Sequence, residues 1–161
     1  MGNLLENEKS IYDLTEENLN ATEMDVLRMS GLPESKFEIR DVKVGTFEDR
    51  DVLMHTVICD RDPSKPTLVI FHGYNGSGTL LYRVINELSK KFTLILPDHI
   101  GMGSSSRPDN FDKHNMSAQQ TIDYFLDYIE NWRVAMDITD FYLGGHSLGG
   151  YIVGNYALKY P

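Results

Sequence analysis

Hydrophobic and polar residues alternate in one part of this sequence and recur at other spacings further along. Residues 36–44 alternate up to Gly45, and a second extended run covers residues 52–58, which is the pattern of a β-hairpin. Three later runs are short and apolar throughout, as in strands covered on both faces, and they lie at residues 67–71, 92–96 and 141–143. The sequence therefore predicts a hairpin followed by three buried strands.

Helical spacing of apolar residues appears between and after these strands. It covers Leu81 to Leu88, then a longer amphipathic stretch from Ile122 to Met136, and it begins again at Tyr151. Parallel strands can be joined only by long segments that pack on the sheet faces, so this succession favours an α/β sheet with right-handed crossovers. Functional residues are then expected at the carboxyl ends of the strands.

Residues 1–35 differ in character from the rest of the chain. They are polar and acidic, their apolar residues fall at irregular helical spacings, and Gly31-Leu32-Pro33 would stop any helix that forms there. We expect a polar N-terminal helical extension, loosely attached, over residues 1–35, and one α/β unit over residues 36–161.

Composition and charge narrow the class of protein. The chain has 161 residues, 41% of them hydrophobic, as in an ordinary globular domain. Its 15 Lys and Arg against 24 Asp and Glu give a formal charge of -9, which would repel a phosphate backbone, so we expect no nucleic-acid partner. The single cysteine, Cys59, excludes an internal disulfide and a zinc–thiolate cluster, and we interpret it as ordinary packing. Without a long apolar run or a secretory leader, a soluble cytoplasmic protein is expected.

The third apolar strand leads into Gly-Gly-His-Ser-Leu-Gly-Gly, which contains the pattern G-x-S-x-G around Ser147, and a helical pattern follows at once. A serine needs a sharp strand-to-helix turn to expose its hydroxyl above a sheet. The turn is so tight that the residues two before and two after, Gly145 and Gly149, must lack side chains. Ser147, preceded by His146, is therefore the candidate nucleophile. The alternative is a glycine-rich turn with an incidental serine, since the short pattern also matches unrelated chains.

A second glycine-rich loop follows the strand that ends at Phe71. It begins with His72 and Gly73, and such a loop can turn backbone N–H groups inward. In a site of this kind the oxyanion hole takes one N–H from this loop and one from the residue after the nucleophile, so Tyr74 and Leu148 are the expected donors. A phosphate-cradling loop is the weaker alternative, because the known phosphate-binding patterns are absent. We interpret His72 as an imidazole that fixes the loop rather than as a general base.

A third loop, Asp-His-Ile-Gly-Met-Gly-Ser-Ser at residues 98–105, also follows a strand. We expect Asp98 to bond loop N–H groups and to hold the turn around Gly101 and Gly103, in preference to a catalytic role for Asp98 or His99. His114 lies in a polar connection and is interpreted as a solvated residue.

Together the three loops, in this order and at these intervals, resemble the α/β-hydrolase superfamily over residues 36–161. The stretch from Asp98 through Arg107-Pro108, the residues 129–133 and the ending at 156–161 are similar to the lipid-metabolic subfamily of abhydrolase-domain proteins. That subfamily includes phospholipid and N-acyl-phosphatidylethanolamine hydrolases, lysophosphatidic acid acyltransferases and lipid-droplet coactivators. Inactive coactivators carry Asn at the nucleophile position, so Ser147 implies a hydrolase.

The resemblance also implies a catalytic triad in the order Ser, then Asp or Glu, then His. The segment after Ser147, LGGYIVGNYALKYP, contains no Asp, Glu or His. We therefore expect residues 36–161 to be the N-terminal part of an α/β-hydrolase domain that ends after the helix of the nucleophile turn. The chain alone is then expected to be inactive or nearly so, and to associate with the missing C-terminal half. Without the remaining strands it is also expected to expose the sheet edge after its last strand, which favours aggregation or pairing with a partner.

Three functions remain open from the sequence. The first is a serine esterase or lipase that forms an acyl-enzyme on Ser147 from an acyl ester, implied by the resemblance to be a lipid or lysophospholipid. The second is a lysophospholipid acyltransferase, and the third is a non-catalytic interaction or scaffold protein of the same fold. No metal or organic cofactor is implied. A lipid substrate would bring the protein to the periphery of a membrane or lipid droplet. The chain begins with Met1-Gly2, as N-myristoylation signals do, but this modification is not favoured because Glu6 occupies the position at which the signal requires Ser or Thr.

Overall fold

The computed structural model describes residues 16–161 except residue 113, so the N-myristoylation question at Met1-Gly2 lies outside the described residues. A five-stranded mixed sheet forms the centre, in the order β1-β2-β4-β3-β5. Strand β1 pairs antiparallel with β2, β2 antiparallel with β4, and β3 lies parallel to both β4 and β5. The strands are β1 (Phe37–Phe47), β2 (Arg50–Cys59), β3 (Thr67–Phe71), β4 (Thr93–Pro97) and β5 (Tyr142–Gly145).

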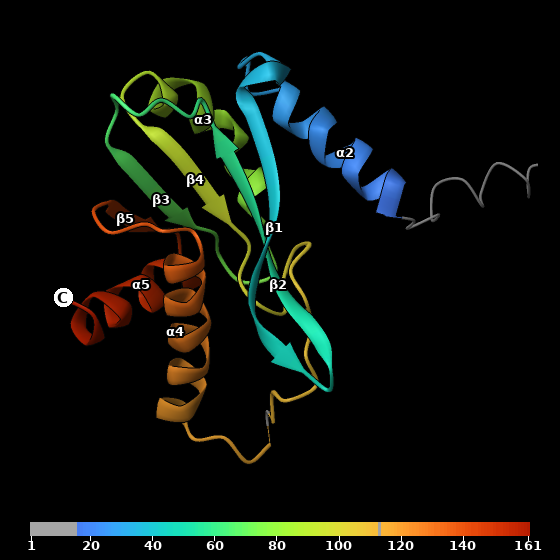
Figure 1. Cartoon of the computed structure of the whole chain (residues 1–161), viewed down its shortest axis with the longest axis vertical. Helices are drawn as coiled ribbons and strands as arrows, with labels where there is room; N and C mark the ends of the chain where they lie inside the picture. The colour runs from blue at the N-terminus through green and yellow to red at the C-terminus, as the bar shows by residue number, and fades with distance from the viewer. Residues whose placement is uncertain (1–15, 113) are drawn as a thin grey trace, which may run out of the picture.

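Helices cover both faces of this sheet, and their positions match the predicted alternation (Figure 1). One core gathers residues of α4, α5 and the sheet around Trp132 and Phe71, and the other gathers residues of α2, α3 and the sheet around Leu27 and Ile85. The α/β sheet with crossover helices predicted from the sequence is confirmed in this part of the chain. The helices are α2 (Glu16–Arg28), η1 (Glu34–Lys36), η2 (Gly78–Leu81), α3 (Tyr82–Ser89), α4 (Ala118–Ala135) and α5 (Leu148–Lys159).

Helix α4 begins and packs as its sequence dictates. The Ser117 hydroxyl accepts a hydrogen bond from Gln120 N–H and the Gln120 side chain accepts one from Ser117 N–H, so a capping box satisfies two backbone donors. Near the other end, the buried Trp132 donates its Nε1–H to Thr56 Oγ1 at 2.9 Å. This bond ties the helix to β2 through the centre of the core.

Helix α2 is more firmly attached than the sequence suggested. Leu27 is fully buried in the second core, where Met24 also packs. The carboxylate of Glu23 accepts hydrogen bonds from Thr79 Oγ1 at 2.7 Å and pairs with His55 Nε2 at 2.9 Å. The expected loose attachment is therefore wrong for this helix, because a few buried contacts hold it despite its irregular apolar spacing.

Strand β5 differs from the predicted buried strand at residues 141–143. It pairs only with β3 in the described residues, and Tyr142 is 61% exposed. The apolar sequence fits a strand covered on both sides, but no described element lies along the outer edge of β5. This strand is thus an exposed sheet edge in the described structure, as expected for the edge after the last strand, and such an edge favours pairing with another segment.

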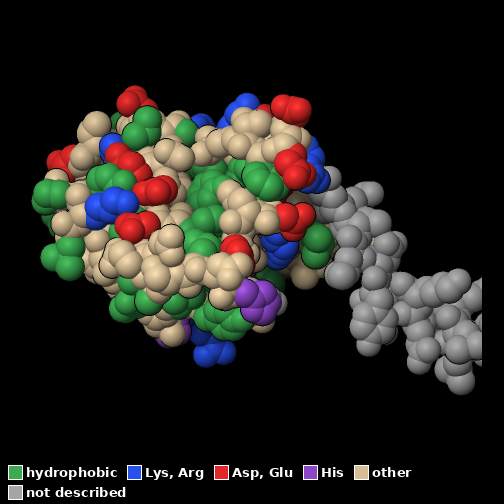
Figure 2. Space-filling model, turned by 90° about the horizontal axis from the view of Figure 1, so that it is seen from below, with side chains coloured by type: hydrophobic (Ala, Val, Ile, Leu, Met, Phe, Trp, Pro, Cys, Tyr) green, Lys and Arg blue, Asp and Glu red, His purple; other side chains and the backbone are tan. Residues whose placement is uncertain are grey.

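Charged groups on the surface form short-range pairs. Lys159 Nζ lies 2.9 Å from Asp127 Oδ1 and 3.1 Å from Asp123 Oδ1, and Lys36 Nζ lies 2.6 Å from Asp60 Oδ1. Figure 2 shows acidic and basic side chains interspersed around an apolar area on the face seen from below. Exposed ion pairs of this kind add little stability, so the two cores hold the fold.

Candidate active site

Ser147 occupies the turn between β5 and α5 in a backbone conformation that non-glycine residues rarely adopt. Its φ is 54° and its ψ is -119°, and the residue is exposed. Such strain persists only where the surrounding structure enforces it, and it clusters at functional sites. The turn closes through hydrogen bonds from Gly149 N–H to His146 O at 2.9 Å and from Tyr151 N–H to Ser147 O at 3.1 Å. The serine side chain is thereby presented at the carboxyl edge of the sheet.

The two glycines that flank Ser147 leave no room for a side chain. A Cβ on Gly145 would lie 2.5 Å from Gly149 O and Gly150 N, and a Cβ on Gly149 would lie 2.5 Å from His72 O and closer still to Phe71 O. All of these neighbours are backbone atoms, which cannot rotate away. The observed crowding is the physical reason for the pattern G-x-S-x-G at this turn.

The loop after β3 lies against Ser147. A Cβ on Gly73 would come within 3.3 Å of Ser147 Cβ, so the two backbones are nearly in contact. Together with Leu80 and Ser77, residues of the two loops line a pocket of about 440 Å³ that contains Ser147. The side chain of Tyr74 in this loop is 79% exposed.

Two backbone donors beside this pocket are free. Among the described residues, none accepts a hydrogen bond from the N–H of Tyr74 or of Leu148. Leu148 opens α5, so its N–H also lies at the positive end of a helix dipole. Unpaired donors next to an exposed serine hydroxyl are what an oxyanion hole requires before substrate binds.

His72 is buried behind the loop and bonded on both ring nitrogens. Its Nδ1 lies 2.7 Å from Gly73 O, and its Nε2 accepts from His99 N–H at 3.0 Å. The ring of His99 lies beneath it, with Nε2 3.2 Å from His72 O. Burial, and next the nearby charge of His72 when protonated, lower the pKa of His99 to about 3, so His99 is neutral.

Asp98 holds two loops together from a buried position. Its Oδ1 accepts from Gly78 N–H at 2.6 Å and its Oδ2 accepts from Ser104 N–H at 2.8 Å. Gly101 and Gly103 both have positive φ, which lets the loop fold back over this carboxylate. Burial raises the pKa of Asp98, against the lowering effect of the two N–H donors. The contacts are those of a loop-holding residue.

None of the histidines in the described residues is bonded to Ser147. His55 is held by two carboxylates, and His72 and His99 are each bonded to the other's backbone. His114 is exposed in the loop before α4, and His146 is exposed beside the serine. The Ser147 hydroxyl has no hydrogen-bond partner among these residues. An unassisted serine hydroxyl is a poor nucleophile at neutral pH.

One ionic cluster was not foreseen from the sequence. The imidazole of His55 lies between Glu23 of α2, at 2.9 Å, and Asp41 of β1, at 2.8 Å. Burial alone would lower the pKa of His55, but the hydrogen bond and charge of Glu23, assisted by Asp41, outweigh it and raise the pKa to about 9. These residues line a pocket of about 740 Å³ that shares Ser77 and Leu80 with the pocket of Ser147. No local sequence signal links three residues so far apart along the chain.

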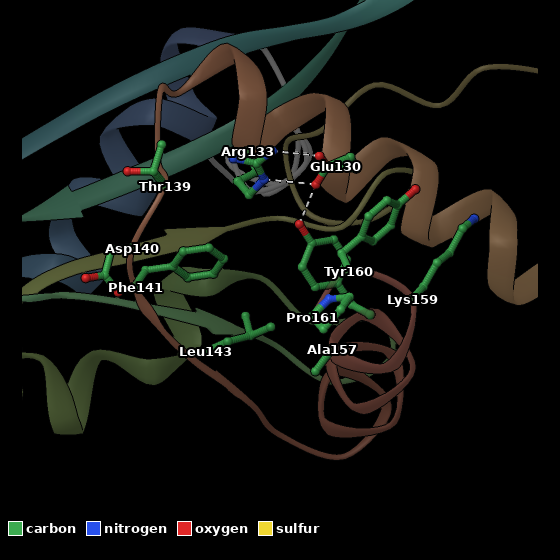
Figure 3. Close-up of a pocket in the computed structure, with 11 residues that line it drawn as sticks. Glu130, Arg133, Thr139, Asp140, Phe141, Leu143, Ala157, Lys159, Tyr160 and Pro161 are labelled. Atoms are coloured by element: carbon green, nitrogen blue, oxygen red, sulfur yellow. Dashed lines mark hydrogen bonds and ion pairs between the residues drawn. The ribbon is translucent and has the colours of Figure 1, made fainter.

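A further pocket of about 740 Å³ lies between α4, β5 and the end of α5 and contains none of the predicted site residues (Figure 3). Three of its polar side chains bond one another, because Arg133 donates to both oxygens of Glu130 and Tyr156 donates to Glu130 at 2.5 Å. Arg133 thereby lowers the pKa of Glu130, against a smaller effect of burial.

The single cysteine, Cys59, is buried. Burial raises the pKa of its thiol to about 12, which confirms the packing interpretation.

Within residues 16–161, apart from residue 113, no helix combines the length and apolar character that crossing a bilayer requires. The same residues contain no group of three or more His, Cys, Asp or Glu side chains arranged to hold a metal ion.

Comparisons with known proteins identify the family of this chain. The model of the family described as the alpha/beta hydrolase fold matches residues 66–161, and the chain belongs to this family. It is 40% identical over 132 residues to a 1-acylglycerol-3-phosphate O-acyltransferase of Arabidopsis thaliana, covering 82% of this chain and 30% of that protein. It is also 40% identical over 102 residues to a (lyso)-N-acylphosphatidylethanolamine lipase of Bos taurus, covering 63% of this chain and 28% of the relative.

Solved structures have the same fold, and the α/β-hydrolase fold predicted from the sequence is confirmed. A bacterial membrane phospholipase A superposes with a TM-score of 0.68 at 19% identity, covering 96% of this chain and 44% of that one. By comparison, the chain spans less than a third of the length of the two curated relatives from Arabidopsis thaliana and Bos taurus. The relatives support an abhydrolase-domain family of lipid hydrolases and acyltransferases, and they confirm the subfamily resemblance drawn from the sequence.

Proposed function

We propose that this chain carries the nucleophile and oxyanion portion of a serine hydrolase that acts on an acyl ester of a lipid or lysophospholipid. The observation that carries the proposal is the strained Ser147, exposed at the sheet edge with the free N–H groups of Tyr74 and Leu148 beside it. The lipid class of the substrate rests on the relatives, which are named for lysophospholipid and N-acylphosphatidylethanolamine chemistry.

The proposed reaction forms and breaks an ester in two steps. Ser147 Oγ attacks the acyl carbonyl carbon while its proton passes to an imidazole base. The two N–H groups hold the oxygen that becomes negative, and the alcohol leaves with the transferred proton. Water then attacks the acyl-enzyme and releases the fatty acid, restoring the serine.

The base of this reaction is not among the described histidines, since none of them is bonded to Ser147. We therefore propose that the 161-residue chain is nearly inactive alone and that an acid and a histidine are supplied by sequence corresponding to the remaining length of the relatives. The free edge of β5 is the place where such a segment could pair.

An acyltransferase is the second candidate, because the Arabidopsis relative bears that name. It would use the same acyl-enzyme and pass the acyl group to a lysophospholipid hydroxyl instead of water. A peripheral contact with a membrane or lipid droplet, from a cytoplasmic location, would serve either reaction. A non-catalytic scaffold would keep the fold without using the serine.

Sequencing the transcript beyond the codon for Pro161 separates these candidates. A downstream Asp or Glu followed by His supports a hydrolase, the pattern H-x-x-x-x-D favours the acyltransferase, and a stop codon favours the scaffold. The protein encoded by the full transcript is then treated with a fluorophosphonate that reacts with activated serines. Labelling should vanish in Ser147→Ala and persist in Ser104→Ala, an exposed serine of a neighbouring loop. Retained labelling in Ser147→Ala would remove the assignment of the nucleophile.

A further inference from the structure

The direction of one peptide unit decides whether Tyr74 N–H can serve as an oxyanion donor. The Gly73 carbonyl accepts a hydrogen bond from Gly76 N–H at 3.1 Å and lies 2.7 Å from His72 Nδ1. The described chain contains no cis peptide bond, so the N–H of Tyr74 points opposite to that carbonyl. A carbonyl turned toward the His72 ring therefore turns the N–H away from it, on the loop that abuts Ser147.

The proton position on His72 follows from its second contact. Nε2 accepts a hydrogen bond from His99 N–H at 3.0 Å, and a ring nitrogen that accepts carries no proton. The proton of the neutral ring is thus on Nδ1, where it is donated to Gly73 O. The ring is 2% exposed, so water cannot substitute for either partner.

Neighbouring groups hold this arrangement from two further sides. Asp98 Oδ1 lies 3.7 Å from His72 Nε2, too far for a hydrogen bond, and that oxygen is already bonded to Gly78 N–H. The neutral His99 ring packs edge-on against the His72 ring at 4.8 Å and donates from Nε2 to His72 O. Both the ring and the backbone of His72 are therefore fixed.

We propose that His72, held as the Nδ1–H tautomer between Gly73 O and His99 N–H, is a positioning residue that aims the Tyr74 N–H at the acyl oxygen. The proposal rests on the proposed function for its purpose, but its structural content is independent of any reaction. It also explains why His72 does not serve as the base for Ser147, because both of its nitrogens are occupied away from the serine.

The tautomer is measured first, on the 161-residue chain itself. The chain is labelled with ¹⁵N-histidine, and two-bond proton–nitrogen spectra assign which ring nitrogen of His72 is protonated. The expected result is a protonated Nδ1 and a bare Nε2, with the exposed His114 as the matched control that shows averaged tautomers. A protonated Nε2, or an imidazolium at neutral pH, overturns the proposal whatever the activity of Ser147.

The positioning role is measured on the catalytically active product of the full transcript. The amide nitrogen of His72→Asn falls where Nδ1 lies and can still donate to Gly73 O, whereas the amide of His72→Gln falls at the Nε2 position and cannot. The asparagine variant should keep kcat within a few-fold. The glutamine variant should lose kcat by roughly 10²- to 10³-fold, the usual cost of one oxyanion donor, with KM little changed.

Equal losses of kcat in the two variants, or a loss confined to KM, would contradict the positioning role. If either variant fails to fold, the tautomer measured in the unaltered chain still decides the structural part of the proposal. Failure of the proposed function looks different, because Ser147→Ala would then leave turnover intact while the His72 tautomer remained as described.

Discussion

Replacing Gly149 by alanine should disrupt the turn around Ser147, whereas the same replacement at Gly154 in the same helix should stabilise the protein. A methyl group on Gly149 would lie 2.5 Å from His72 O and closer to Phe71 O, while real Cβ atoms essentially never come within 3.0 Å of such neighbours. The end of β3 and the start of α5 would have to separate by about half an ångström or more. Overpacking against backbone costs at least about 3 kcal/mol, at the upper end of the usual range. A methyl group on Gly154 meets nothing within 4 Å.

The Gly154→Ala variant gains because alanine loses less conformational entropy than glycine in a helix, by about 0.5–1 kcal/mol. For a chain of this size 1 kcal/mol shifts Tm by roughly 2–4 °C. Circular dichroism melts of the 161-residue chain should show Gly154→Ala up by about 1–4 °C and Gly149→Ala down by about 6–12 °C. A melting temperature of Gly149→Ala at or above that of the unaltered chain would show that this crowding does not constrain the turn.

Two further predictions concern the His55 cluster and turnover. Because the hydrogen bond and charge of Glu23 outweigh burial and raise the pKa of His55 from 6.5 to about 9, its contribution to stability is present in full below pH 6.5 and is lost as the pH rises through 9. The urea concentration at the midpoint of unfolding should fall over that pH interval, and His55→Gln should remove this pH dependence. Curves of midpoint against pH that run parallel in the two proteins would contradict a stabilising His55–Glu23 pair. The 161-residue chain should hydrolyse a p-nitrophenyl ester no faster than about 10⁻⁴ of the full transcript product, since losing triad members costs on the order of 10⁴ to 10⁶ in kcat. Robust turnover abolished by Ser147→Ala would show that a histidine of this chain acts as the base.

The fold was predictable where residues close in sequence decide the structure. Strand β3 begins and ends as its apolar run predicted, and the turn around Ser147 follows from glycines two residues to either side. The attachment of α2 was not predictable, because it depends on Glu23 meeting His55 and Thr79 across the fold. The free edge of β5 was expected because no further strand follows it in the sequence, although its apolar residues alone predicted a strand covered on both faces.

The candidate site shows the same division between local and distant contacts. The loop role of Asp98 was expected from its position before a glycine-rich turn, but its two N–H partners come from separate loops. His72 was expected to fix its loop. Which ring nitrogen does so depends on His99 N–H, whose approach no spacing in the sequence reveals.

The proposed nucleophile and the proposed oxyanion loop are positioned by one structural feature, the end of strand β3. Phe71 O accepts from His146 N–H at 3.0 Å and crowds Gly149, while His72 O crowds the same glycine and accepts from His99. A displacement of this strand end would therefore move Ser147 and the Tyr74 N–H together, and their separation would change little. Tyr74 would act through its backbone N–H alone, so the proposed role places no demand on its exposed side chain. Preorganisation of this kind needs no reorganisation when charge develops on the acyl oxygen, which is the condition under which backbone donors are most effective.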